Sequence, residues 1–112
     1  MKRDNSLYIN DTIVALATAS GVGAIAVIRL SGKEAIADSV FKPYTGKSLL
    51  EAPSHTVHLG TLESKDQVID ECLATIFKRT KSYTGEPVVE FSCHGSNYIV
   101  EEVIKLCLAK GA

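Results

Sequence analysis

The stretch DTIVALATASGVGAIAVIRLSG, residues 11–32, decides the fold of this chain. Two apolar runs, residues 12–17 and 24–30, flank a small glycine loop, and both runs are rich in valine and isoleucine. β-Branched side chains favour a pleated, partly buried surface. We therefore predict two strands that are joined through the glycine loop.

A single charge, Arg29, interrupts the second apolar run. Successive side chains of a strand point to opposite faces, so Arg29 shares one face with Ile25 and Val27. The other face is wholly apolar and consists of Ala24, Ala26, Ile28 and Leu30. An unpaired charge in such surroundings is very costly, so we expect Arg29 to have a partner.

The composition indicates one folded domain. The chain has 112 residues, of which 46% are hydrophobic and 22% charged, which suits a single core. The net charge of −1 predicts no broad basic surface for nucleic acid, and the absence of tryptophan argues against a base-stacking platform. No apolar run has the length of a signal core or a membrane span, so no membrane contact is expected.

The cysteines and the missing motifs limit the chemistry. Cys72, Cys93 and Cys107 are odd in number, widely spaced and without a CxxC pair, which argues against a disulfide framework and a zinc site. Reduced thiols are typical of a cytosolic protein. The sequence contains neither a P-loop GxxxxGK[ST] nor an HExxH motif. We therefore predict no catalytic and no metal-binding residue in this chain.

Periodicity predicts two helices and three further strands. Ser31 and Glu34 match a capping box, which predicts a helix that ends at residues 42–43. Strands are predicted over residues 55–62, 68–77 and 87–94. A last helix is predicted from the N-cap Ser96 to a stop at Gly111. The side chains expected to be buried are Ile36, Ala37, Val40 and Phe41 in the first helix and Ile99, Val100, Val103, Ile104, Cys107 and Leu108 in the last.

This order of elements, ββα-βββ-α, predicts an α+β fold. Each helix is expected to cover one face of a mixed or mainly antiparallel sheet, which gives a two-layer sandwich. Residues 1–10 are polar and are interpreted as a lead-in.

Two glycines, Gly21 and Gly23, begin a GxGxxA pattern. Such a pattern marks a dinucleotide site only where a helix begins, because the helix N-terminus holds the pyrophosphate. A valine- and isoleucine-rich run follows here, so a tight connection between strands is the favoured interpretation. A further interpretation is that the bare backbone amides leave room for a ligand or a partner chain.

Glu90 is the second notable charge. In the strand 87–94, Glu90 shares one face with Ser92 and His94, while the other face is apolar. Three interpretations of the polar face are open: a solvated surface, a structural ion pair with Arg29, and the wall of a polar pocket. The loop at residues 82–86, SYTGE, has the hydroxyls, ring and acid that functional loops often carry.

Several segments closely resemble the N-terminal domain of the MnmE family of tRNA modification GTPases, also called TrmE. They are DTIVA (residues 11–15), GAIAVIRLSG (23–32), SYTGE (82–86), VVE (88–90) and CHG (93–95). The resemblance covers residues 11–112, which are interpreted as one TrmE-type domain. The pair 19–20, Ala-Ser, stands where the family usually has two prolines, Pro87 replaces a usual acid and Ser96 a usual glycine. Arg29 and Glu90 are intact.

The resemblance implies that this domain binds 5-formyltetrahydrofolate or a related reduced folate, in a fold similar to the folate-binding domains of one-carbon enzymes. It implies Arg29 and Glu90 as folate-binding residues. Gly21, Gly23 and Tyr83 are secondary candidates for the folate site or a dimer interface. A carboxylate can accept two parallel hydrogen bonds from a pterin, and a guanidinium offers a planar donor fork.

The family protein is longer, and the resemblance implies a following helical domain with an inserted GTPase domain for GTP, magnesium and potassium. This chain stops before both and is expected to lack GTPase activity. The resemblance also implies a homodimer and a cytoplasmic protein. With its FAD-binding partner MnmG, the whole protein is implied to modify C5 of the wobble uridine of certain tRNAs. The alternatives are a small dimeric interaction or regulatory module in which Arg29 and Glu90 form a structural pair, and an RNA-binding module.

Overall fold

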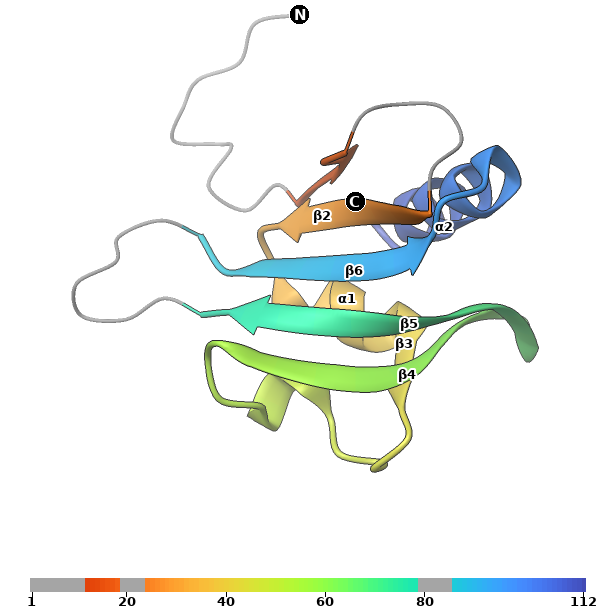
Figure 1. Ribbon diagram of the computed structural model, residues 1–112. Coiled ribbons are helices and arrows are strands. Elements are labelled where there is room, and N and C mark those ends of the chain that lie inside the picture. Colours follow the sequence, from red (N-terminus) through yellow and green to blue (C-terminus); the bar gives the residue numbers. More distant parts are fainter. Residues whose placement is uncertain (1–11, 19–23, 79–85) are drawn as a thin grey trace, which may run out of the picture.

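The structure is a computed structural model, and it describes residues 12–18, 24–78 and 86–112. These residues form a six-stranded sheet with two helices packed against one face (Figure 1). The strands are β1 (Ile13–Leu16), β2 (Ile25–Ser31), β3 (Phe41–Pro43), β4 (Thr56–Ser64), β5 (Gln67–Phe77) and β6 (Val88–His94). The helices are α1 (Glu34–Val40) and α2 (Asn97–Ala109), with a short 3₁₀ helix, η2 (Leu49–Glu51). The predicted two-layer α+β sandwich is confirmed.

The sheet has the order β1-β2-β6-β5-β4-β3, and each pair of neighbouring strands is antiparallel. The last strand along the chain, β6, is therefore inserted between β2 and β5. Its register places Glu90 opposite Arg29 on β2 and opposite Thr75 on β5. Residues from three distant segments thus form one row across the middle of the sheet.

The core lies between the sheet and the helices. The predicted alternation of β2 is confirmed, since Ala26, Ile28 and Leu30 are buried. Phe91 of β6 stacks on Phe41, with ring centroids 5.9 Å apart. The fully buried side chains with the largest volumes are Phe41, Phe91, Ile28, Leu49, Leu62, Ile76, Val40, Val89, Val103 and Cys107.

Helix α2 begins as predicted and differs in its buried face. The Ser96 hydroxyl accepts a hydrogen bond from the Ile99 N–H at 3.1 Å, which confirms the N-cap. Cys107 is buried as predicted, but Leu108 is exposed and Leu106 is buried in its place. The buried side of the helix is therefore rotated slightly about the helix axis relative to the predicted one, because packing against β1 and β6 determines which residues are covered.

The predicted capping box of the first helix is wrong. Ser31 is the last residue of β2, and its hydroxyl donates to the Glu86 carboxylate at 3.3 Å. The N-cap position belongs to Lys33, which has no side-chain cap, and its own N–H donates to the Thr12 hydroxyl at 2.9 Å. The ladder between β2 and β6 extends to Ser31 and holds it in extended conformation, so the local capping pattern is overridden.

The predicted helix also extends too far, because Phe41 belongs to a strand. Helix α1 ends at Val40, and Phe41 has extended backbone angles, φ −110° and ψ 131°. Strand β3 pairs with β4 at the edge of the sheet, where Pro43 opposite Gly60 is tolerated. The three residues of β3 carry too short a pattern to be recognised in the sequence.

Gly60 provides the space that β3 needs. A Cβ atom at this position would lie 2.3 Å from the Lys42 carbonyl oxygen and 2.7 Å from the Phe41 ring. We expect Gly60→Ala to lower the free energy of unfolding by about 1–3 kcal/mol, because β3 must move away. Urea denaturation measures the loss, with alanine at the exposed Glu101 of α2 as the control. An unchanged midpoint in Gly60→Ala would contradict this account of β3.

Candidate functional site

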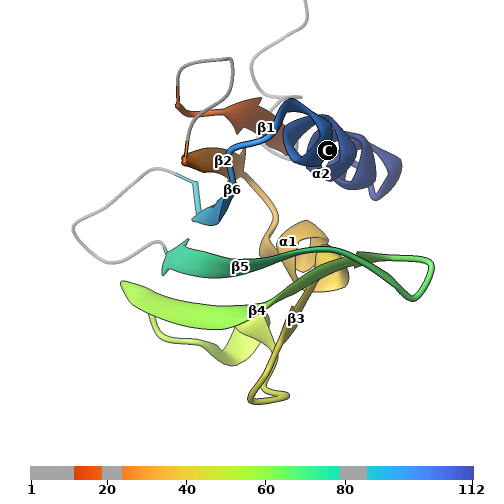
Figure 2. The same ribbon diagram turned by 45° about the vertical axis from the view of Figure 1, so that its right-hand side comes forward.

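Both described helices lie on one face of the sheet, and no helix of the described residues covers the other face (Figure 2). We call it the open sheet face, and it is defined by Ile25, Val27, Arg29, Val57, Leu59, Leu73, Thr75, Glu90, Ser92 and His94. The polar side chains of β6 run along its middle. Apolar side chains of β2 lie on one side of them, and those of β4 and β5 lie on the other. The face therefore combines a charged and polar centre with exposed apolar flanks.

Arg29 and Glu90 form an ion pair on this face, which confirms the prediction that Arg29 has a partner. The arginine Nε donates to Glu90 Oε2 at 2.8 Å, and Nη2 lies 2.6 Å from the same oxygen. The second carboxylate oxygen makes no hydrogen bond to the described residues. The arginine side chain is 51% exposed and that of Glu90 is 23% exposed, so the pair is accessible from solvent. Arg29 is thus paired without being a buried charge.

His94 ends β6 and is held by Asp70 of β5. Its backbone N–H and its ring Nδ1 lie 2.8 and 2.7 Å from the two oxygens of the Asp70 carboxylate. No local pattern in the sequence indicates this contact. Asp70 lies in an ordinary strand pattern. It contacts His94 beyond Leu73 and Ser92, where the pairing of β5 with β6 ends.

A cavity of about 160 Å³ lies at this end of the open sheet face. It is lined by Ala24, Ile25, Glu71, Ser92, Cys93 and His94. The Glu71 carboxylate is fixed by the Tyr44 hydroxyl, which donates to Oε2 at 2.6 Å. This hydrogen bond raises the pKa of Tyr44. The cavity thus carries hydrogen-bond acceptors beside an apolar wall.

The three cysteines are buried free thiols. Burial raises the pKa of Cys107 to about 12. The hydrogen bond with Cys93, together with burial, raises the pKa of Cys72. Thiols with raised pKa values stay protonated near neutral pH and are poor nucleophiles, so Cys72 and Cys107 belong to the core.

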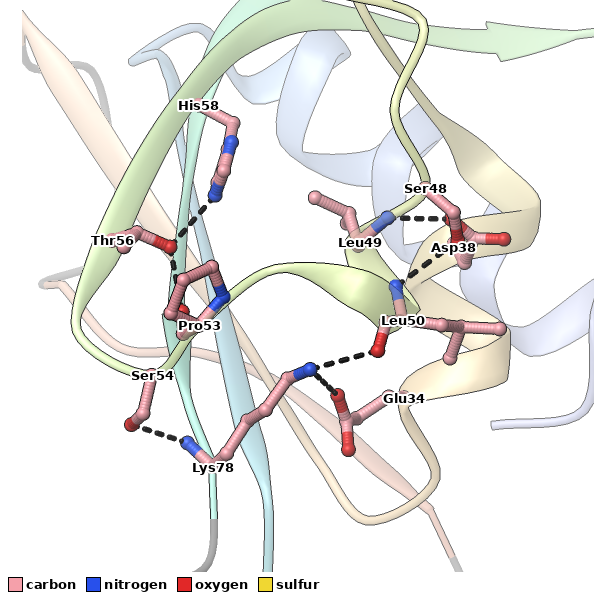
Figure 3. A network of polar contacts seen from close by, with 10 residues as sticks. All are labelled: Glu34, Asp38, Ser48, Leu49, Leu50, Pro53, Ser54, Thr56, His58 and Lys78. Carbon is pink, nitrogen blue, oxygen red and sulfur yellow. Dashed lines mark hydrogen bonds and ion pairs between the residues drawn. The ribbon is translucent and has the colours of Figure 1, made fainter.

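A second polar network joins the α1 side of the molecule to the end of β5 (Figure 3). Lys78 donates to the Leu50 carbonyl at 2.8 Å and pairs with Glu34 at 3.5 Å. Asp38 accepts hydrogen bonds from the Ser48 hydroxyl and the Leu49 N–H, both at 2.9 Å. These contacts fix η2 against α1, which assigns the network a structural role.

Metal and membrane features are absent from the part of the chain that the structure describes. Residues 12–18, 24–78 and 86–112 contain no group of three or more His, Cys, Asp or Glu side chains that could hold a metal ion. Neither described helix is long and apolar enough to cross a membrane. The candidates Gly21, Gly23 and Tyr83 lie outside the described residues, so their predicted roles remain predictions.

The fold and this face define an α+β domain in which helices cover one sheet face, while the other carries no helix within the part of the chain that the structure describes. The family model described as GTP-binding protein TrmE N-terminus matches residues 12–112, and the chain belongs to this family. The protein named tRNA modification GTPase MnmE from Flavobacterium psychrophilum is 55% identical over 107 residues, which is 94% of this chain and 23% of that protein.

Further relatives carry the same name. The protein from Christiangramia forsetii is 54% identical over 106 residues, which is 93% of this chain and 22% of the relative. The protein from Bacillus subtilis is 42% identical over 106 residues, which is 91% of this chain and 23% of the relative. The chain thus spans less than a quarter of the length of the relatives it matches.

Proposed function

We propose that this domain binds a reduced folate, such as 5-formyltetrahydrofolate, on the open sheet face. The observation that carries the proposal is the accessible pair of Arg29 and Glu90. Glu90 has one oxygen without a hydrogen bond to the described residues, and a carboxylate can accept several bonds. It therefore suits the N3–H and 2-amino group of a pterin. The next row across the sheet places Val27 and Leu73 on either side of Ser92, where a flat ring has apolar neighbours.

We infer that the domain works within a tRNA modification GTPase, the activity named for its relatives. In the whole protein, GTP, magnesium and potassium belong to a GTPase domain, and the reduced folate on this domain is the one-carbon source. With the FAD-binding partner MnmG, the protein modifies C5 of the wobble uridine of certain tRNAs in the cytoplasm. The 112-residue chain has no P-loop motif, so it is proposed to bind folate without hydrolysing GTP.

Calorimetric titration of the 112-residue chain with 5-formyltetrahydrofolate tests the folate site. We expect saturable binding of one folate for each chain. p-Aminobenzoylglutamate, which lacks the pterin, is the control ligand and should bind far more weakly. Absence of folate binding would reject the proposal in favour of an interaction module with a structural ion pair. Equal binding of both ligands would reject the assignment of the pterin to Glu90.

We also propose that the domain forms a homodimer, with β1 as a candidate edge. This strand ends the sheet, and its outer side has no neighbouring strand among the described residues. Unpaired strand edges favour pairing with another chain, and lysine on an edge opposes it. Light scattering should give twice the 12.0 kDa of one chain.

An edge variant tests the position of the dimer contact. Ile13 on β1 and Val57 on β4 are 55% and 57% exposed, so lysine at either position has a similar effect on solubility. Ile13→Lys should shift the protein toward the monomer, whereas Val57→Lys should not. A monomer mass for the unaltered chain across a wide concentration range would contradict the dimer. Dissociation by Val57→Lys alone would contradict β1 as its edge.

A further inference from the structure

The contact between Asp70 and His94 is not used by the proposed pterin site. Asp70 binds His94 twice, through the backbone N–H at 2.8 Å and through Nδ1 at 2.7 Å. The Asp70 side chain is only 9% exposed, whereas that of His94 is 73% exposed. A nearly buried carboxylate therefore fixes the orientation of an imidazole that is open to solvent.

This contact sets the tautomer of the ring. An ionised carboxylate only accepts hydrogen bonds, so the proton must lie on Nδ1. In the neutral imidazole, Nε2 then presents a lone pair on the opposite side of the ring. Nε2 makes no hydrogen bond to the described residues. A carboxylate that holds one ring nitrogen in this way is a common means of preparing the other nitrogen for a ligand.

The position of His94 relates it to the Arg29–Glu90 pair. His94, Ser92 and Glu90 lie on the same face of β6, because they are two residues apart along a strand. At a rise of about 3.3 Å for each residue, His94 lies about 13 Å along the strand from Glu90. A folate whose pterin lies at Glu90 is long enough to bring its benzoylglutamate half to the cavity beside His94.

The cavity favours a donor over an acceptor. His94 and Glu71 both line it, and Glu71 is an acceptor already fixed by Tyr44. A ligand carboxylate would meet like charge at Glu71, whereas an N–H group would meet acceptors. The amide N–H that joins the benzoyl ring to glutamate is such a donor.

We propose that His94, oriented by Asp70, is a further ligand-binding residue of the open sheet face, which accepts a hydrogen bond from the amide N–H of the benzoylglutamate half of a reduced folate. This inference rests on the proposed folate binding. Asp70 acts through His94 and is a positioning residue. The site therefore binds both halves of the ligand, the pterin at Glu90 and the benzoylglutamate half at His94.

Two variants distinguish the orientation of the His94 ring by Asp70 from a purely structural role of their contact. Asp70→Asn still accepts the His94 backbone N–H, but its amide donates to Nδ1 and moves the ring proton to Nε2, which then opposes the ligand N–H. His94→Asn keeps a donor toward Asp70 and removes Nε2. Each variant should weaken binding of 5-formyltetrahydrofolate about tenfold, as the loss of one hydrogen bond does. Long-range ¹H–¹⁵N spectra of the free chain should show the tautomer exchange in Asp70→Asn.

The matched ligand is 5-formyltetrahydropterin, which lacks the benzoylglutamate half. Both variants should bind it as the unaltered chain does, and this result also shows that they are folded. Equal losses for the two ligands, or no loss for the folate, would overturn the role of His94. If the unaltered chain binds neither ligand, the proposed folate binding itself is wrong. If the unaltered chain binds the folate and both variants bind it equally well, only the role of His94 is wrong.

Discussion

Replacing Phe91 by alanine should lower the free energy of unfolding by about 3–5 kcal/mol, the usual cost of removing a buried phenylalanine. Phe91 is completely buried on the core face of β6, and its ring stacks on Phe41 at a centroid distance of 5.9 Å. The cavity left behind would touch the central strand of the sheet and the short edge strand β3 together. A single domain of this size has a total stability of about 5–15 kcal/mol, so the loss is large.

Urea denaturation followed by circular dichroism measures this loss. Phe91→Leu is the second variant, because it keeps much of the volume and should remain folded if the alanine variant does not. Tyr98→Ala is the control, since it removes an aromatic side chain that is mostly exposed on α2. If Phe91→Ala loses no more stability than Tyr98→Ala, Phe91 does not hold the core together.

The strands with clear alternation could be predicted from the sequence. In β2 and β6, small and branched apolar residues alternate with the other side chains, and this period of two fixes which residues share a face. The prediction of β5 over residues 68–77 agrees with the observed Gln67–Phe77. Local patterns were sufficient here because one face of each strand is buried against the helices.

Elements that depend on distant partners could not be predicted in the same way. Strand β3 exists because β4 pairs with it, and Ser31 is extended because β6 pairs with β2. The sequence pattern of strand β4 predicts a strand but does not determine which of its two faces points inward. Val57 points outward, and Thr56 can point inward because its hydroxyl donates to the Pro53 carbonyl and contacts His58.

The candidate site shows the same division. Arg29 is the only charge in its strand, so a partner was predictable, and Glu90 was one of the candidates. The register that joins them comes from the pairing of segments 61 residues apart, which no local pattern contains. The hydrogen bonds between Asp70 and His94 form where β5 and β6 separate, and no local sequence pattern predicts them.

Replacing Glu90 by glutamine should lower the affinity for 5-formyltetrahydrofolate by about 2–5 kcal/mol, the range for losing one partner of a charged pair that the ligand desolvates. Glutamine removes the charge and turns one acceptor toward the pterin into a donor that faces a donor. The stability of the free chain should change much less. Arg29 is half exposed in the free chain, and exposed ion pairs contribute little to folding.

Calorimetric titration and a melting curve of each variant separate binding from stability. Glu101→Gln is the matched control, because it makes the same chemical change on the exposed side of α2. Glu90→Gln should weaken 5-formyltetrahydrofolate and 5-formyltetrahydropterin alike, since both carry the pterin that Glu90 is proposed to bind. A purely structural pair predicts the opposite result, a lower melting temperature of Glu90→Gln with no folate binding by either chain. Equal affinities of the Glu90→Gln and unaltered chains for the folate would therefore remove Glu90 from the site.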